Sequence, residues 1–72
     1  MINYGEALKY QREINELSQM ELARRTGLKQ SMISWWEAGK GLPNIDFCVW
    51  LADFYGITLD ELVGRDHGRE KQ

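Results

Sequence analysis

Helix-capping signals recur along this chain at intervals that leave room only for short helices. In three places a short polar residue stands three positions before a glutamate, which is the spacing of a capping box. In such a box each side chain satisfies a backbone amide that the first turn of the helix leaves unpaired. The three pairs are Asn3 with Glu6, Ser18 with Glu21, and Thr58 with Glu61.

Glycines stand where these helices would end, because glycine adopts the left-handed conformation of a helix C-terminus at little cost. A further helix start is expected at Asn44, directly after Pro43. Strand signals are scarce, since no stretch alternates cleanly and no Asn-Gly or Asp-Gly turn separates apolar runs. We therefore predict an all-α fold with five helices, at about residues 4–15, 19–25, 30–38, 45–55 and 59–63. The glycines are Gly27, Gly39, Gly56 and Gly64.

The length of 72 residues permits a single hydrophobic core. We expect one domain over residues 1–64 and a short polar tail over residues 65–72. The apolar residues of the five helices are numerous enough to fill that core. The predicted core residues are Leu8, Ile14, Leu17, Leu22, Ala23, Ile33, Trp36, Ile45, Val49, Ala52, Leu59 and Leu62.

Several classes of protein are excluded by what the sequence lacks. The one cysteine, Cys48, cannot form an internal disulfide and is expected to act as a small buried apolar residue. His67 has no second His or Cys at ligand spacing, so we expect no metal site. No catalytic motif or phosphate-binding glycine loop is present, so we predict neither an enzyme nor a cofactor or small-molecule substrate. No apolar run is long enough for a membrane span or signal peptide, and we expect a cytoplasmic protein.

The charge distribution divides the chain into two parts. The net charge is −2, which argues against a general binder of polyanions. Residues 1–40 carry six Lys/Arg and five Asp/Glu, whereas residues 41–64 carry four acids and no basic residue. Any contact with nucleic acid is therefore expected in the first half of the chain.

Residues 17–39, LSQMELARRTGLKQSMISWWEAG, contain two short helices joined by a tight turn. Ser18 caps the first helix, Gly27 ends it, and the second helix begins near Gln30. The small Ala23 lets the two helices approach closely. This arrangement is typical of a helix-turn-helix, in which the second helix protrudes from the domain.

On a helical wheel the second of these helices has an inner and an outer side. Ile33 and Trp36 point inward and are expected to anchor the helix in the core. The outer side carries small amide or hydroxyl side chains and one tryptophan. Such side chains suit the DNA major groove, where glutamine pairs with adenine edges, but they also suit an ordinary solvated helix face. The outer residues are Gln30, Ser31, Ser34, Trp35 and Ala38.

Spaced motifs over roughly residues 5–63 resemble the XRE/Cro/phage-repressor family of helix-turn-helix domains. The matching segments are Leu8-Lys9 with Arg12, then LSQMELARRTGL, SMISWWEAGKGLP and LADFYGITLDEL. The resemblance implies a compact five-helix, lambda-repressor-like domain. It further implies a transcriptional regulator that binds a double-stranded DNA operator as a homodimer. Repression is the expected mode of regulation.

The resemblance also implies roles for single residues. Gln19 matches a glutamine that hydrogen-bonds a DNA phosphate and often a side chain of the recognition helix. Lys40 matches a residue that touches the DNA backbone. The recognition helix, at about residues 30–38, would lie in the major groove. Its base-reading and groove-wall positions are Gln30, Ser31, Ser34 and Trp35.

Arg12 and Glu37 resemble the partly buried ion pair that ties the first helix to the end of the recognition helix. The pair is plausible on physical grounds, because a glutamate on the inner side of that helix needs a cationic partner. Its role would be structural. Arg24 and Arg25 either approach phosphates or are ordinary solvated charges.

Two residues depart from the family pattern. Lys29 stands where a Ser or Thr usually caps the recognition helix, which weakens the cap but offers a cation to a phosphate. Trp35 replaces a polar or basic side chain, and an indole offers only one hydrogen-bond donor. The small number of basic residues predicts modest non-specific affinity and a shallow salt dependence.

The segment at residues 45–55 is apolar nearly all round. Phe47, Trp50 and Phe54 share one side of it, and we call them the aromatic stripe. They either cover the core of a small domain or form a protein interface, for which a homodimer is the expected partner. The alternative function is an antitoxin-like or adaptor module that engages another protein through this stripe.

Overall fold

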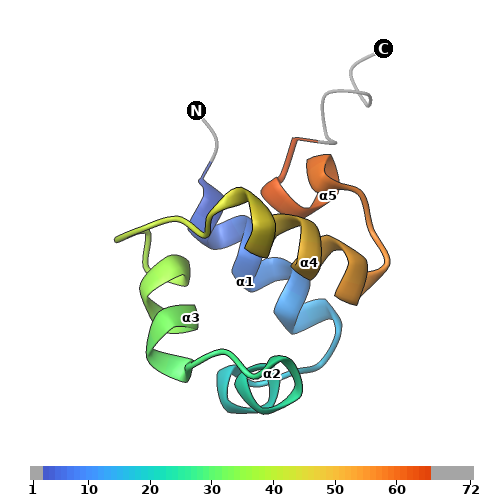
Figure 1. The fold of residues 1–72 in the computed structure, drawn as a ribbon. Coiled ribbons are helices and arrows are strands. Elements are labelled where there is room, and N and C mark those ends of the chain that lie inside the picture. Colours follow the sequence, from blue (N-terminus) through green and yellow to red (C-terminus); the bar gives the residue numbers. More distant parts are fainter. Residues whose placement is uncertain (1–2, 66–72) are drawn as a thin grey trace.

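The computed structural model describes residues 3–65, and over that range it contains five helices and no strand (Figure 1). The all-α prediction is thus confirmed, with each helix end within one residue of its expected place. The predicted tail, Arg65 excepted, and His67 lie outside the described residues. The helices are α1 (Tyr4–Ile14), α2 (Gln19–Thr26), α3 (Gln30–Glu37), α4 (Ile45–Tyr55) and α5 (Leu59–Val63).

Two of the three predicted capping boxes form in full. The boxes at Ser18 and Thr58 are complete, with both reciprocal hydrogen bonds formed. Asn3 and Asn44 each accept a hydrogen bond from the third following amide, at 3.0 and 2.9 Å, so the Asn3 box is half formed. The four glycines expected at helix ends all have positive φ.

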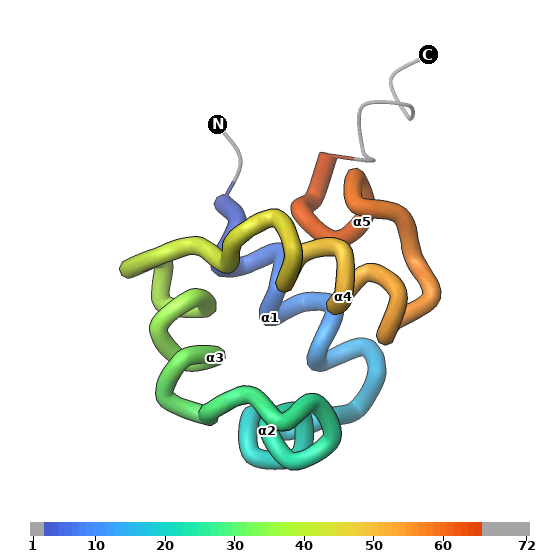
Figure 2. The backbone as a smooth tube through the Cα atoms, in the orientation of Figure 1, coloured from blue at the N-terminus to red at the C-terminus, as the bar shows by residue number. Residues whose placement is uncertain are grey.

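The helices are arranged around α1, which runs through the middle of the domain (Figure 1). α1 contacts α3 and α5, while α2 packs on α3 and α4 packs on α5. The backbone trace in Figure 2 shows α2 and α3 together at one end, with α4 crossing in front of α1. No helix within residues 3–65 has both the length and the apolar character that a membrane span requires.

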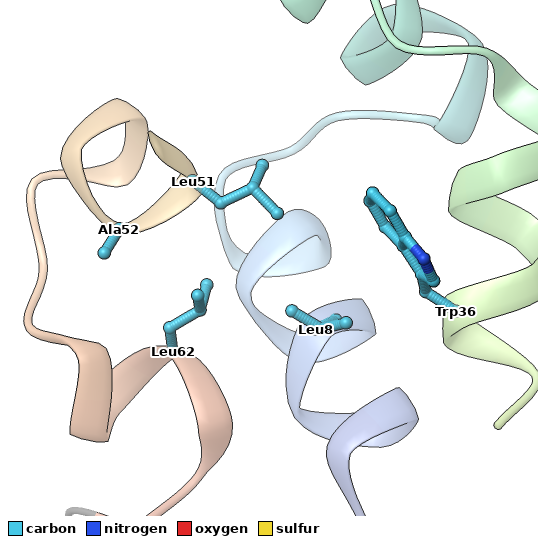
Figure 3. Close-up of a cluster of buried hydrophobic side chains, with 5 residues drawn as sticks. All are labelled: Leu8, Trp36, Leu51, Ala52 and Leu62. Atoms are coloured by element: carbon cyan, nitrogen blue, oxygen red, sulfur yellow. The ribbon is translucent and has the colours of Figure 1, made fainter. Parts of the chain in front are cut away.

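One core cluster joins four of the five helices. Leu8 from α1, Trp36 from α3, Leu51 and Ala52 from α4, and Leu62 from α5 converge between the helices (Figure 3). Leu62 is fully buried. A second cluster holds the helix-turn-helix against the rest of the domain and consists of Leu17, Leu22 and Ile33.

The predicted core was wrong at four positions, because Ile14, Ile45, Val49 and Leu59 are exposed. Leu51, which was not among the predicted core residues, is only 3% exposed. The error arises mainly in α4, where apolar side chains on most sides leave the buried side ambiguous. Burial of Leu51 and Ala52 turns Val49 toward solvent.

The backbones of α1 and α3 come into direct contact at Gly5. A methyl group added there would lie 2.6 Å from the carbonyl oxygen of Glu37 and 2.8 Å from that of Trp36. Both obstacles are backbone atoms at the end of α3, so no side chain can rotate away. Only glycine fits this crossing.

We expect Gly5→Ala to lower the free energy of unfolding by about 1–3 kcal/mol, the usual range for overpacking. The loss would occur although alanine is the better helix former by about 1 kcal/mol. Urea unfolding followed by circular dichroism measures it, and Lys9→Ala on the exposed side of α1 is the control. A Gly5→Ala variant as stable as the parent would contradict the contact.

Tyr55 carries a buried hydroxyl that has no hydrogen-bond partner within residues 3–65. Burial and, to a smaller extent, the nearby Glu37 carboxylate raise the pKa of this phenol to about 12, while Arg12 opposes the shift. The folded protein therefore disfavours the phenolate that the unfolded chain forms near pH 10.

This shift predicts a loss of stability at alkaline pH. The neutral phenol stabilises the fold below the unfolded pKa, and this contribution disappears as pH rises from about 10 to 12. The unfolding free energy of the parent should therefore fall relative to that of Tyr55→Phe, which has no ionisable hydroxyl, when both are measured across this interval. Parallel curves would show that Tyr55 ionises equally in both states.

Candidate nucleic-acid interface

α2 and α3 form the helix-turn-helix that the sequence predicts. Gly27 ends α2 in the left-handed conformation, with φ of 78°. Beside it, the Thr26 hydroxyl donates to the carbonyl of Leu22 at 2.7 Å and accepts from the amide of Leu28 at 3.2 Å. The turn is therefore closed by hydrogen bonds on both sides, which fixes where α3 begins.

α3 is buried on one side and open on the other. Ile33 and Trp36 are 2% and 6% exposed and anchor the helix in the two core clusters. All four predicted contact residues of the recognition helix are exposed, and we call them the outer face of α3. They are Gln30, Ser31, Ser34 and Trp35. Their orientation agrees with the helical wheel, and their contact with DNA stays a prediction.

A buried ion pair ties α1 to the end of α3. The Arg12 guanidinium donates from Nε to Glu37 Oε2 at 2.7 Å and from Nη2 to Glu37 Oε1 at 2.9 Å. Its Nη1 donates to the carbonyl of Leu17 at 2.8 Å. The hydrogen bond to Glu37 raises the pKa of Arg12, while burial opposes the rise. The pair therefore links α1, α3 and the segment that leads into α2.

The hydrogen bonds continue from this pair toward the outer face of α3. Gln19, the first residue of α2, donates from Nε2 to Glu37 Oε1 at 3.0 Å. Its Oε1 accepts from Nε2 of Gln30 at 3.5 Å, which is a long contact. The Gln19 amide is thus oriented by a buried carboxylate, and it in turn faces the first residue of α3.

The two lysines of the candidate interface flank α3. Lys29 is the exposed N-cap residue and makes no side-chain capping bond, as expected from its departure from Ser or Thr. Lys40 follows the helix, and its ammonium lies 5.9 Å from the centroid of the Trp35 ring. Arg24 and Arg25 are exposed in the last turn of α2. Cations therefore lie at both ends of the outer face.

Gly41 is a residue of this region that the sequence reasoning missed. A methyl group on Gly41 would collide with the indole of Trp35, so the ring packs directly against the loop backbone. The signal available in the sequence was the Gly-Lys-Gly run after the helix. That run indicates a tight loop, but it does not say which side chain the loop covers.

The aromatic stripe of α4 packs in part on the core. Phe47 packs on Trp36 with ring centroids 5.6 Å apart, and Phe54 packs against the second core cluster. Only Trp50 is classed as exposed, at 43%, and its ring stacks on Phe54 at 5.6 Å. Two of the three rings thus cover the core.

A second exposed apolar region lies on the other side of α4. A groove of about 350 Å³ runs between the start of α1, the α3–α4 loop and α5. Its exposed apolar residues are Tyr4, Leu42, Ile45 and Leu59. Cys48 also lines it, and burial raises the pKa of that thiol, which keeps it in the unreactive protonated form.

Within residues 3–65 no cluster of His, Cys, Asp or Glu is placed to hold a metal ion.

Comparison with known proteins agrees with this geometry. The sequence profile of a helix-turn-helix family matches residues 8–62. The transcriptional activator BcrR of Enterococcus faecalis is 34% identical over 62 residues, which are 86% of this chain and 30% of that protein. The phage CTXphi transcriptional repressor RstR of Vibrio cholerae is 35% identical over 60 residues, 83% of this chain and 54% of the repressor.

An uncharacterised helix-turn-helix transcriptional regulator of Methanocaldococcus jannaschii is 31% identical over 55 residues, 76% of this chain and 83% of that protein. The chain thus spans about a third of the activator and about half of the repressor, at 30% and 54% of their lengths. The matched residues contain the whole helix-turn-helix and both core clusters. The resemblance to the XRE/Cro/phage-repressor proteins is confirmed, and the chain belongs to this helix-turn-helix family.

Proposed function

We propose that this protein is a transcriptional regulator that binds double-stranded DNA in a sequence-specific manner, with α3 in the major groove. The observation that carries the proposal is the outer face of α3, which is exposed and, apart from Trp35, carries short polar side chains, while the inner side of the helix is fixed in the core. The relatives are named as an activator, a repressor and a regulator of transcription. A domain bound to an operator can block transcription by occupancy alone, and we therefore favour repression.

The residues divide into those that position the domain and those that specify the sequence. Gln19 is oriented by Glu37 and is assigned a DNA phosphate through its second amide hydrogen. Lys29 and Lys40, at the two ends of α3, are assigned to phosphates on either side of the groove. Gln30, Ser31 and Ser34 are assigned to base edges, where glutamine suits adenine.

We propose that residues 1–64 are the DNA-binding domain and that residues 65–72 are a polar tail. We further propose that the protein acts in the cytoplasm, without catalysis and without a cofactor. The supporting observations are the family match over residues 8–62 and the polar outer face of α3.

Selection of random duplexes against the purified protein tests the proposal. We expect recovery of one motif, with a shallow salt dependence because few cations face the DNA. Gln19→Ala should weaken binding to all duplexes alike, whereas Gln30→Ala should alter the preference at one base pair, worth about 1–3 kcal/mol. Binding is measured by fluorescence anisotropy at two salt concentrations.

The two glutamine variants control for each other, because the residues are hydrogen-bonded neighbours with different assigned roles. Full affinity in Gln19→Ala would remove the phosphate contact. No enriched motif at the lower salt concentration would sink the DNA-binding function and favour the alternative, an antitoxin-like or adaptor module. The specific observation behind this alternative is Trp50 of the aromatic stripe, which is 43% exposed.

We also propose that the protein forms a homodimer through the aromatic stripe, with the exposed Trp50 at its centre. Support comes from Trp50, which is exposed, stacks on Phe54 and lines a pocket together with Phe47. A two-fold dimer would place two recognition helices about 34 Å apart, which fits half-sites one turn apart on DNA.

Sedimentation equilibrium tests the dimer. Trp50→Glu should yield monomers, because it places a charge at the centre of an apolar contact. Ile45→Glu is the matched variant, since Ile45 belongs to the same helix but lines the apolar groove. If only Ile45→Glu yields monomers, the interface lies at that groove. If both variants remain dimers, neither surface forms the interface.

A further inference from the structure

We propose that Trp35 is a positioning residue that holds Lys40 against the DNA backbone, and that it does not contact bases. This inference rests on the proposed DNA-binding function. It concerns the residue of the outer face that departs most from the polar side chains around it. The indole of Trp35 already contacts the loop that follows α3. We assign it to that loop and not to the major groove of DNA.

The backbone brings the two residues together. The amide of Gly39 donates to the carbonyl of Trp36 at 3.0 Å, and the amide of Lys40 donates to the carbonyl of Trp35 at 3.1 Å. With Gly39 at φ of 78°, these two bonds form a Schellman motif. In this motif the residue after the glycine folds back over the residue near the helix end, so Lys40 must lie beside Trp35.

The side chains use this proximity. The Lys40 ammonium lies 5.9 Å from the centre of the indole, within the range of about 6 Å for a cation–π contact. The pyrrole edge of the same ring packs on Gly41, where an added methyl group would come within 2.7 Å of Cδ1. Consecutive loop residues therefore both contact the indole, one with its side chain and one with its backbone.

This arrangement reduces the freedom of Lys40 before DNA is bound. Ordering a long side chain at an interface costs binding free energy, and prior ordering removes part of that cost. The indole has a single hydrogen-bond donor, so it offers little sequence discrimination in return. Base recognition then falls to Gln30, Ser31 and Ser34, and Trp35 acts on affinity through Lys40.

Gly41→Ala tests this directly, because the variant keeps both Trp35 and Lys40 but leaves no room for the indole on the loop. Alanine is compatible with the backbone there, since Gly41 is not among the glycines with positive φ. Binding of the selected duplex should weaken about two- to tenfold, the cost of ordering one long side chain. Trp35→Leu should lose the same amount.

Lys40→Gln should reduce the steepness with which the logarithm of the binding constant falls with the logarithm of the salt concentration. We expect this slope to change by about one, the value for one lost phosphate contact. Added to that variant, Gly41→Ala should cause no further loss of affinity, because the cation that the indole positions is already gone. Additive losses, or an unaffected Gly41→Ala, would overturn the proposal. Circular dichroism checks that each variant is folded, and Trp35→Leu replaces Gly41→Ala if the latter is not.

A repeated selection with Trp35→Leu separates positioning from base contact. The recovered motif should match that of the parent at every base pair, whereas Gln30→Ala, the matched control on the same face, should alter it. A motif relaxed at one base pair in Trp35→Leu would show that the indole contacts that base pair and would overturn the proposal.

Proton NMR without DNA distinguishes a failure of this inference from a failure of the proposed function. The side-chain protons of Lys40 should show an upfield ring-current shift that Gly41→Ala and Trp35→Leu abolish. Absence of this shift in the parent would overturn the packing itself. A clear shift in a protein that enriches no duplex would instead refute the DNA-binding function, and the role of Lys40 at DNA with it.

Discussion

The ion pair between Arg12 and Glu37 is the contact on which the placement of α3 depends. Burying two charges carries a desolvation cost that their attraction seldom exceeds by much, so the pair is a weak source of net stability. The pair instead orients the Glu37 carboxylate, because a guanidinium that donates through two nitrogens holds the carboxylate in one plane. That carboxylate then orients Gln19. Loss of either partner would leave a buried charge unpaired and remove one of the restraints on the end of α3.

The end of α3 is constrained by more than this pair. Its last carbonyl groups lie against Gly5 of α1, so the two backbones meet without side chains between them. Its C-terminus is closed by a Schellman motif, which sets the start of the following loop. The start of the helix lacks a side-chain cap at Lys29, and its restraint comes from the turn that Thr26 closes. The helix α3 is therefore held at its C-terminal end, on its core side and by the turn before it.

Capping chemistry made the helices predictable, because Ser18 and Thr58 act within one turn of their own positions. The outer face of α3 was also predictable, because burial of Ile33 and Trp36 leaves the helix only one orientation. The buried side of α4 was mispredicted although a signal existed. At about 100° per residue, Asp46 and Asp53 share one side and Leu51 lies opposite. The contact of Trp35 with Gly41 depends on the loop path, which no local pattern encodes.

The charge balance explains why the placement of single cations matters in this domain. A strongly basic protein gains affinity from many phosphate contacts and tolerates disorder in any one of them. Here the net charge is −2 and residues 41–64 contain no basic side chain. Under the proposed function, the electrostatic contribution of residues 3–64 comes from a few lysines and arginines in or beside α2 and α3. With so few, each cation that is already ordered before binding counts for more, which is what the stacking of Lys40 on Trp35 provides.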